Sequence, residues 1–131
     1  MKPLNLTYIL LILAGLLFTF SAISNAQNPE FKITRLGQFE SPWALEFLPD
    51  GRILISEMGG ALKLLNKEGE LAGLVRGVPE VARGGQGGLG DVVLHPDFEK
   101  NRFVYLSYAE AGPGNTLGAA VARATLELTE N

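Results

Sequence analysis

The sequence predicts an all-β fold, and three observations support that prediction. Apolar and polar residues alternate with period two from residue 43 onward, as they do in half-buried strands. Glycine, proline, asparagine and aspartate recur at short intervals between these segments, where tight turns need them. A strand-turn-strand pattern is also written twice along the chain. Short strands joined by tight turns are therefore expected.

The first 26 residues are predicted to be a helical, cleavable export signal rather than part of the fold. Lys2 gives a short positive start, an apolar run covers residues 4–20, and Ser24-Asn25-Ala26 offers small residues for cleavage before Gln27. An uncleaved anchor is the alternative, because about 17 apolar residues are at the low end of what spans a bilayer. We expect an exported protein, periplasmic or extracellular, with no stable membrane anchor after cleavage.

The length and composition of the chain limit its domain count, its covalent cross-links and its partners. Without the signal, 105 of the 131 residues remain, which by length is one small domain. The chain has no cysteine, so neither a disulfide nor a lipid on cysteine is available. The net charge is −3, and acidic residues are scattered, which argues against a nucleic-acid partner that would want a basic stripe.

The first set of strands lies between residues 43 and 78. Trp43–Leu48 alternates, and Pro49-Asp50-Gly51 is a turn in which proline presets one dihedral and glycine accepts a positive φ. Arg52–Glu57 is predicted as a buried second strand, Ala61–Leu65 as a third, and a weaker fourth lies between Glu70 and Val78.

The second set repeats the pattern. Asp91–Leu94 leads into the turn His95-Pro96-Asp97-Phe98, and Arg102–Tyr108 follows as a strand. A flexible loop, Gly112-Pro113-Gly114-Asn115, then precedes a strand from about Ala119 to Leu128.

The repeat has the period of a β-propeller blade. The Pro-Asp pairs at 49 and 96 are 47 residues apart, and the serines at 56 and 107 are 51 apart. A unit of about 50 residues with four short strands is typical of a blade, and a closed ring needs four to eight of them. We expect about two blades of a larger propeller, hence a partial chain. A small β-sandwich containing two similar hairpins is the alternative.

The segment 83–88, Arg-Gly-Gly-Gln-Gly-Gly, is the most distinctive candidate site. It is not a phosphate loop, because no Gly-Lys-Ser/Thr follows and it enters a strand instead of a helix. A tight crossing between sheets is the bland interpretation. Gln86 favours binding, because its amide is a donor and acceptor held among glycines.

The other candidate residues have structural interpretations. His95, the only histidine, stands before a Pro-Asp turn, at the position of Leu48 in the first copy, which favours a structural or surface role over catalysis. Asp50 and Asp97 are expected to form turns rather than to act as catalytic carboxylates. Asp91 indicates a buried hydrogen bond or a pocket wall, and Trp43 is expected to face the core. The sequence shows no metal-ligand constellation.

Three segments, Ser41–Gly51, Gly85–Phe98 and Tyr105–Tyr108, resemble the opening of the exported glucose/sorbosone dehydrogenase family, which includes quinoprotein glucose dehydrogenases and aldose sugar dehydrogenases using pyrroloquinoline quinone (PQQ). The resemblance runs from about Phe31 to Asn131, and its most specific part is the run from Gly-Gln-Gly-Gly to His-Pro-Asp-Phe.

This resemblance implies a six-bladed propeller that holds PQQ and Ca²⁺, with residues 27–131 as its first two blades. A histidine would take the proton of an aldose C1 hydroxyl, hydride would pass to the quinone, and an external acceptor would take the electrons. Of the family's pocket residues only Gln86 is matched, near the sugar hydroxyls. The base, the PQQ-binding cations and the calcium ligands are expected beyond Asn131, and His95 does not match that base. The chain alone is therefore expected to be inactive.

Two other functions stay open at this point. One is a propeller that binds or scaffolds without the cofactor pocket. The other is a metal-dependent lactonase on a similar ring, which would need a carboxylate cluster in its channel. Later blades would discriminate them, because the dehydrogenase needs a histidine, arginine and lysine there. Fold analogy alone does not choose.

Overall fold

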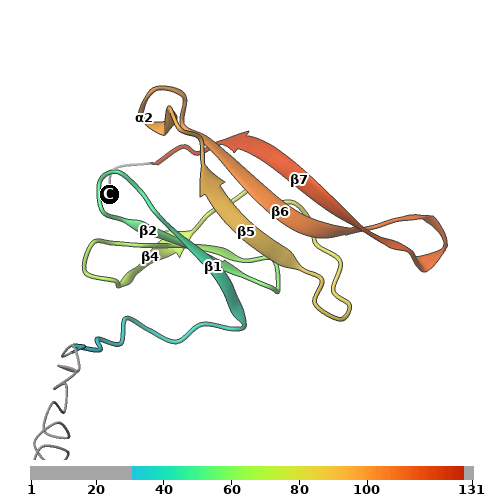
Figure 1. Ribbon diagram of the computed structural model, residues 1–131, viewed down its shortest axis with the longest axis horizontal. Helices are drawn as coiled ribbons and strands as arrows, with labels where there is room; N and C mark the ends of the chain where they lie inside the picture. The colour runs from blue at the N-terminus through green and yellow to red at the C-terminus, as the bar shows by residue number, and fades with distance from the viewer. Residues whose placement is uncertain (1–30, 129–131) are drawn as a thin grey trace, which may run out of the picture. The chain divides into compact units, whose positions relative to one another are not determined.

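Two antiparallel sheets make up the described part of the chain, residues 31–128 of this computed structural model (Figure 1). Sheet A follows chain order: β1 (Pro42–Phe47), β2 (Ile53–Glu57), β3 (Leu62–Leu65) and β4 (Leu71–Leu74). Sheet B does the same: β5 (Leu89–Leu94), β6 (Phe103–Ala111) and β7 (Leu117–Thr125). Two short helical turns, α2 (Phe98–Asn101) and η2 (Pro113–Asn115), link the strands of sheet B.

The predicted all-β class is confirmed, and the predicted strands match the observed ones to within a few residues. Each sheet is built from strands that are consecutive along the chain. In a Greek-key sandwich, by contrast, the chain crosses from one sheet to the other. The predicted signal, residues 1–26, lies outside the described residues, and the number of blades remains a prediction. Within residues 31–128 there is no helix with the length and apolar character needed to cross a membrane.

The helical turn α2 was not predicted. It fills the longer connection after the second Pro-Asp pair and ends at Arg102, which takes a left-handed φ of 58°. Phe98 is its buried residue and anchors the turn in the core. A helix of four residues with one buried side chain is too short to show a helical hydrophobic period in the sequence. The segment was therefore predicted as a turn.

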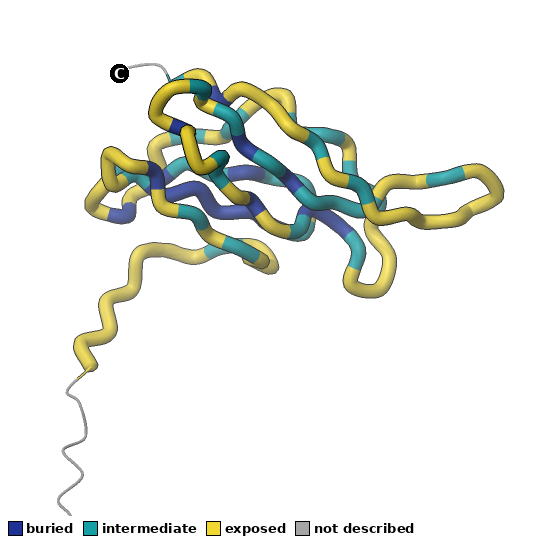
Figure 2. The backbone as a smooth tube through the Cα atoms, turned by 45° about the horizontal axis from the view of Figure 1, so that its top comes forward, coloured by how far each residue is buried: buried dark blue, intermediate teal, exposed yellow. Residues whose placement is uncertain are grey.

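The core lies between the facing surfaces of the two sheets (Figure 2). Sheet A contributes Leu54 and Leu62, which are 0% and 1% exposed, and the turn after β1 contributes Leu48, which is 3% exposed. Sheet B and its connections supply the other members of the cluster: Leu89, Val92, Phe98, Val104, Leu106 and Leu126. The strand β5 of sheet B lies against the strands β1 and β2 of sheet A. We call these facing surfaces the inner faces and the opposite surfaces the outer faces.

A buried serine ties the inner faces together. The Ser56 hydroxyl, fully buried, accepts a hydrogen bond from the Ala44 amide at 3.1 Å and donates to the Gly90 carbonyl of sheet B at 2.6 Å. Next to it the Leu89 amide donates to the Met58 carbonyl at 3.2 Å. Because Ser56 satisfies polar groups on both sheets, it fixes their relative position at this end.

Ser56→Ala is expected to destabilise the chain by about 1–3 kcal/mol, because it leaves the half-buried Gly90 carbonyl without its donor. Urea unfolding followed by circular dichroism measures the change. Ser107→Ala is the matched control, since that hydroxyl accepts only the exposed Asp91 amide within the described residues and should cost less than about 1 kcal/mol. Equal losses in the two variants would contradict a bridging role for Ser56.

A second, smaller cluster lies on the outer face of sheet A. Ile53, Ile55 and Leu65 pack there against Phe39, which belongs to the segment leading into β1. The Glu57 carboxylate, which is 5% exposed, holds this segment by accepting from the Glu40 amide at 2.6 Å.

Lys63 completes the attachment of the lead-in segment. Its ammonium nitrogen lies 2.7 Å from Glu57 Oε1 and 5.4 Å from the centre of the Phe39 ring. One carboxylate and one cation therefore fasten the lead-in segment to sheet A.

The prediction that Trp43 faces the core was wrong. Its side chain is 50% exposed, as are those of Leu45 (56%) and Phe47 (62%), which follow it on the outer face of β1. Leu45 and Phe47 share one face of β1, as the alternation predicted, but alternation does not reveal whether that face is covered.

Candidate functional site

The glycine-rich loop links the two sheets and presents Gln86 at its tip. It is the connection drawn in yellow just before β5 in Figure 1. The Gly87 amide donates to the Gly84 carbonyl at 2.8 Å, which closes a turn around Gly85 and Gln86. Gly85 has a φ of 59°, which glycine adopts without strain. The turn leaves Gln86 exposed to solvent.

One residue of β6 holds both ends of this loop. The Ala82 amide donates to the Ala109 carbonyl at 2.8 Å, and the Ala109 amide donates to the Gly88 carbonyl at 2.9 Å. Residues 83–87 therefore project from a neck of two backbone hydrogen bonds. A side chain at Gly87 would lie 3.2 Å from the Ala109 methyl group, so the neck needs small residues on both sides.

Two further side chains lie close to the loop. The Arg83 guanidinium lies about 4.0 Å from where a Cβ on Gly59 would stand, in the turn between β2 and β3. A Cβ on Gly84 would lie 2.9 Å from Leu117 Cδ1, at the start of β7. The loop therefore carries a cation and a neutral amide. These groups can hydrogen-bond a hydroxyl-bearing ligand, but neither is a base at neutral pH, so this is a binding edge rather than a complete catalytic site.

His95 lies at the far end of β5 from this loop. Six residues of strand separate the two, or about 20 Å, and Figure 1 shows the loop and α2 at opposite ends of β5. The His95 Nδ1 accepts from the Asp97 amide at 2.9 Å, and the Asn101 side-chain amide lies 2.9 Å from the same nitrogen. The ring also stacks on Tyr105. The structure thus places His95 in the turn around α2 and not beside Gln86.

The two other acidic candidates are in turns, as predicted. Asp50 pairs with Arg52 at 2.7 Å, and hydrogen bonding to that guanidinium lowers the pKa of Asp50 from its ordinary value. Asp97 precedes α2 and lies 4.0 Å from Lys100.

The prediction for Asp91 was wrong. Its side chain is exposed, so it neither fills a buried polar site nor lines a described cavity, and it is the backbone amide of Asp91 that bonds to Ser107. The buried role was predicted because Asp91 is a polar residue in an otherwise apolar strand. Asp91 is exposed like Val93, two residues further on, whereas Val92 between them is buried, so the sequence pattern did not show which face of β5 is covered.

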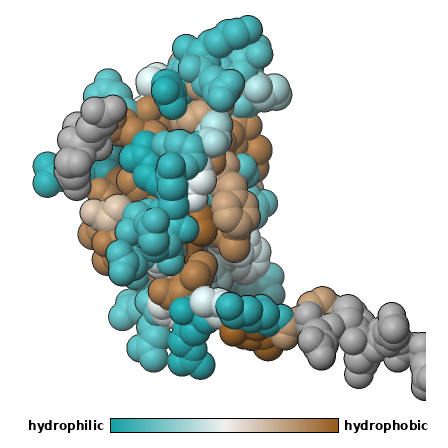
Figure 3. Space-filling view, turned by 90° about the vertical axis from the view of Figure 1, so that its left-hand side faces the viewer, coloured by the Kyte–Doolittle hydropathy of each residue, from teal (hydrophilic) through white to brown (hydrophobic). Residues whose placement is uncertain are grey.

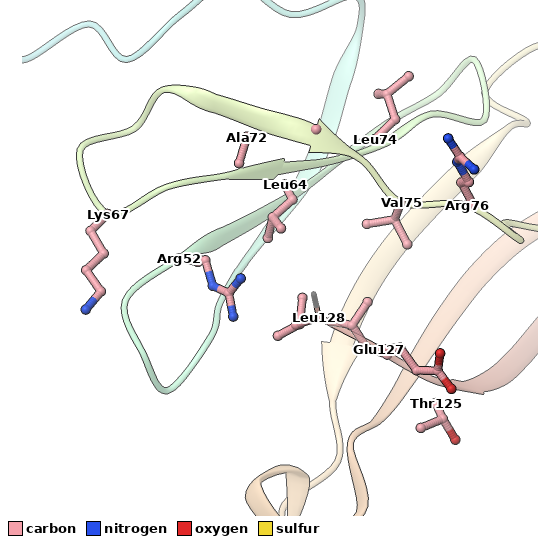
Figure 4. A pocket seen from close by; sticks show the side chains of 12 residues that line it. Arg52, Leu64, Lys67, Ala72, Leu74, Val75, Arg76, Thr125, Glu127 and Leu128 are labelled. Carbon is pink, nitrogen blue, oxygen red and sulfur yellow. The ribbon is translucent and has the colours of Figure 1, made fainter. Parts of the chain in front are cut away.

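A large cavity lies elsewhere, between β3–β4 and the chain that follows β7. It has a volume of about 1120 Å³, and Arg52, Leu64 and Val75 line one side of it, with Thr125 and Leu128 on the other (Figure 4). Neither Gln86 nor Arg83 lines it. No local motif could have revealed this cavity, because its residues range from position 52 to 128.

Comparison with known proteins decides the family. The family model described as Glucose / Sorbosone dehydrogenase matches residues 39–131, most of the chain. The chain belongs to the glucose/sorbosone dehydrogenase family. The resemblance inferred from the sequence segments is confirmed by this match and by the relatives below.

Two curated proteins similar to this chain are named as sugar dehydrogenases. Aldose sugar dehydrogenase YliI of Escherichia coli is 46% identical over 85 residues, which cover 64% of this chain and 23% of that protein. Quinoprotein glucose dehydrogenase B of Acinetobacter calcoaceticus is 32% identical over 102 residues, covering 75% and 21%. The chain thus spans about a quarter of the length of these relatives.

Solved structures of the family match the same fold. The apo form of the soluble aldose sugar dehydrogenase from Escherichia coli is 44% identical, with a TM-score of 0.64, over 67% of this chain and 26% of that one. The PQQ-bound aldose sugar dehydrogenase from Streptomyces coelicolor is 26% identical, with a TM-score of 0.61, over 69% of this chain and 26% of that one. The two sheets therefore have the arrangement of one quarter of these dehydrogenases.

Proposed function

We propose that this chain contributes two sheets to a propeller that oxidises aldose sugars, with PQQ as cofactor. The observation that carries the proposal is the family match over residues 39–131, which includes the loop that presents Gln86. The activity is proposed for the assembled propeller and not for sheets A and B alone. Solved relatives named as aldose sugar dehydrogenases support the substrate class.

The reaction we propose converts the C1 hydroxyl of an aldose to the lactone. A base would take the proton from the hydroxyl oxygen, and PQQ, if bound, would supply a two-electron acceptor for the hydride of C1. An external acceptor then removes the electrons. Gln86 contributes hydrogen bonds to sugar hydroxyls, because its side chain is exposed at the tip of a loop whose two ends, Ala82 and Gly88, bond to Ala109. It orients the sugar and moves no proton.

The base is proposed to come from outside this chain. His95, its only histidine, has Nδ1 engaged in the α2 turn and lies at the wrong end of β5.

The described residues do not fit a calcium site. Among residues 31–128 no group of three or more histidine, cysteine, aspartate or glutamate side chains could hold a metal ion. Calcium prefers six to eight oxygen ligands, so the isolated carboxylates here cannot supply a site. No step of the reaction is assigned through calcium on these residues. The same finding disfavours a lactonase whose metal would be held by sheets A and B.

A non-catalytic propeller remains the second candidate function. It is favoured by the character of the described loop, which can bind but carries no base. Activity measurements on a protein that contains these residues and the remaining sheets discriminate the two functions.

A chimera tests the proposal. Residues 39–131 replace the matching quarter of the Escherichia coli aldose sugar dehydrogenase, and dye reduction is measured with glucose, PQQ and Ca²⁺. We expect turnover by the chimera and none by the 131-residue chain alone. A folded but inactive chimera would favour the non-catalytic function, and turnover by the chain alone would show that the base lies within it.

In the same chimera Gln86→Ala is expected to raise the KM for the sugar about tenfold, the effect of losing one or two hydrogen bonds to substrate. Glu99→Gln, an exposed change on α2 at the other end of sheet B, is the control and should leave KM unchanged. An unchanged KM in Gln86→Ala would remove the substrate role of Gln86 without affecting the family assignment.

A further inference from the structure

The turn between β1 and β2 carries the one aspartate–glycine pair of the sequence, Asp50-Gly51. An aspartate before glycine is chemically labile, because glycine has no side chain to keep its backbone nitrogen away from the aspartate carboxyl group. The sequence has no asparagine–glycine pair, and its other two aspartates, Asp91 and Asp97, precede valine and phenylalanine. The labile dipeptide is therefore confined to this turn.

The reaction open to this dipeptide converts aspartate to isoaspartate in two steps. The Gly51 nitrogen attacks the carboxyl carbon of Asp50, a C–N bond forms, and the carboxyl OH leaves with the amide hydrogen as water. Water then adds to the main-chain carbonyl of the succinimide ring and opens it, so that the chain continues through the former side-chain carbonyl. The protonated carboxyl group is the reactive form, because its OH is the leaving group.

Burial does not protect the dipeptide from this reaction. Asp50 and Gly51 are both exposed, and the Asp50 side chain is 42% exposed. Their turn lies on the left-hand side of Figure 1, the side that faces the viewer in Figure 3, where hydrophilic side chains reach the surface. Any protection has to come from contacts within the turn.

Three hydrogen bonds hold the Asp50 carboxylate. Its Oδ1 accepts from the Arg52 backbone amide at 3.0 Å, and its Oδ2 accepts from Arg52 Nε and Nη2 at 3.0 and 2.7 Å. A guanidinium group that binds a carboxylate in this way favours the charged form. Hydrogen bonding to Arg52 accordingly lowers the pKa of Asp50, which reduces the fraction of the protonated, reactive form.

The attacking nitrogen is engaged as well. The Gly51 amide donates to the Leu48 carbonyl at 2.9 Å, and the Leu48 amide donates to the Arg52 carbonyl at 2.8 Å. Lys67, from the turn between β3 and β4, lies beside Gly51, with its Cγ 3.5 Å from where a Cβ on that glycine would stand. Attack on the carboxyl carbon therefore requires the bond from Gly51 to Leu48 to break.

We propose that Asp50-Gly51 is a site of isoaspartate formation, and that Arg52 suppresses the reaction by binding the Asp50 carboxylate. Conversion adds a carbon atom to the backbone of the turn, because the chain then runs through the side chain of residue 50. The two backbone hydrogen bonds of Leu48 depend on the normal spacing of this turn, so conversion releases β1 from β2 at this end. The inference is independent of the proposed sugar oxidation.

Loss of the Arg52 charge tests the proposal. The full 131-residue chain and its variants are incubated at mildly acidic pH and physiological temperature, and peptide mass spectrometry with electron-transfer fragmentation locates and quantifies isoaspartate. Arg52→Gln, shown to be folded by circular dichroism, should form isoaspartate at position 50 about fivefold faster than the unmodified chain, the effect of losing an exposed ion pair. Equal rates would overturn the proposal, as would isoaspartate at Asp91 or Asp97 instead of Asp50.

Control variants separate the role of Arg52 from other causes. Arg76→Gln removes an exposed arginine outside the turn and should react at the rate of the unmodified chain. Ser56→Ala weakens the contact between the sheets but leaves the turn intact, so it should react more slowly than Arg52→Gln. Equal rates in these last two variants would show that global stability, and not Arg52, protects the dipeptide.

The unfolded chain is the final control. In urea sufficient to unfold every variant, the unmodified chain and Arg52→Gln should form isoaspartate at the same rate, faster than either does when folded. A faster reaction of Arg52→Gln in urea would overturn the proposal, because its effect would then come from the local sequence and not from the folded turn.

Discussion

Gly88→Ala is expected to prevent the chain from adopting its two-sheet fold, at a cost above about 4 kcal/mol. A Cβ at this position would overlap the Met58 carbonyl, and the φ of 142° is one that residues other than glycine rarely adopt. Met58 cannot move aside, because its carbonyl accepts from Leu89 and its amide donates to Ser41 at 3.0 Å. Circular dichroism should show the loss of strand signal at a temperature where the unmodified chain is folded.

Gly77→Ala separates the two causes of that loss. Gly77 also has a positive φ, 78°, but nothing lies within 4 Å of where its Cβ would stand. This variant should fold and lose only about 1 kcal/mol, the cost of the unfavourable backbone conformation. If both variants lost the same stability, the close approach of Gly88 to Met58 would not be what fixes the junction of the sheets.

Glu57→Ala is expected to destabilise the chain by about 3–5 kcal/mol. The carboxylate is nearly buried, and its removal leaves the Lys63 ammonium group partly buried without its partner at 2.7 Å. It also leaves the Glu40 amide without an acceptor, which releases the lead-in segment from sheet A. Urea unfolding measures the stability, and proteolysis between residues 34 and 41 should become faster.

Two further variants test whether an unpartnered charge causes this loss. Asp50→Ala breaks the more exposed pair with Arg52 and should cost less than about 1 kcal/mol. The double variant Glu57→Ala/Lys63→Met should be more stable than Glu57→Ala alone, since it removes the remaining cation as well. A double variant as unstable as the single one would show that the Glu40 contact, and not the charge, accounts for the loss.

The strands and their order were predictable because their causes are local. Alternation set the faces of β1 and β2, and the residues of the turn at Pro49-Asp50-Gly51 have the geometry that a hairpin requires. The repeat was also visible, because the turn residues recur at a fixed spacing.

What the sequence did not reveal depends on contacts between distant residues. Trp43 was expected in the core, yet its exposure depends on whether another sheet covers β1, and no residue of β1 itself encodes that. The loop of Gln86 was recognised by its glycines. Its neck, however, joins it to Ala109, 23 residues after Gln86, and nothing in an alanine marks it as such a partner. The exposure of Asp91 likewise depends on which face of β5 packs against another sheet.

Because both ends of the Gln86 loop bond to Ala109, we expect the length of the loop to have little effect on the stability of the sheets. Both strand-side hydrogen bonds end at one residue of β6, so residues inserted between positions 84 and 87 would enlarge the loop without altering the spacing of its two ends. New ligand preferences could therefore evolve, or be engineered, by changing this loop alone, with β5 and β6 left as they are.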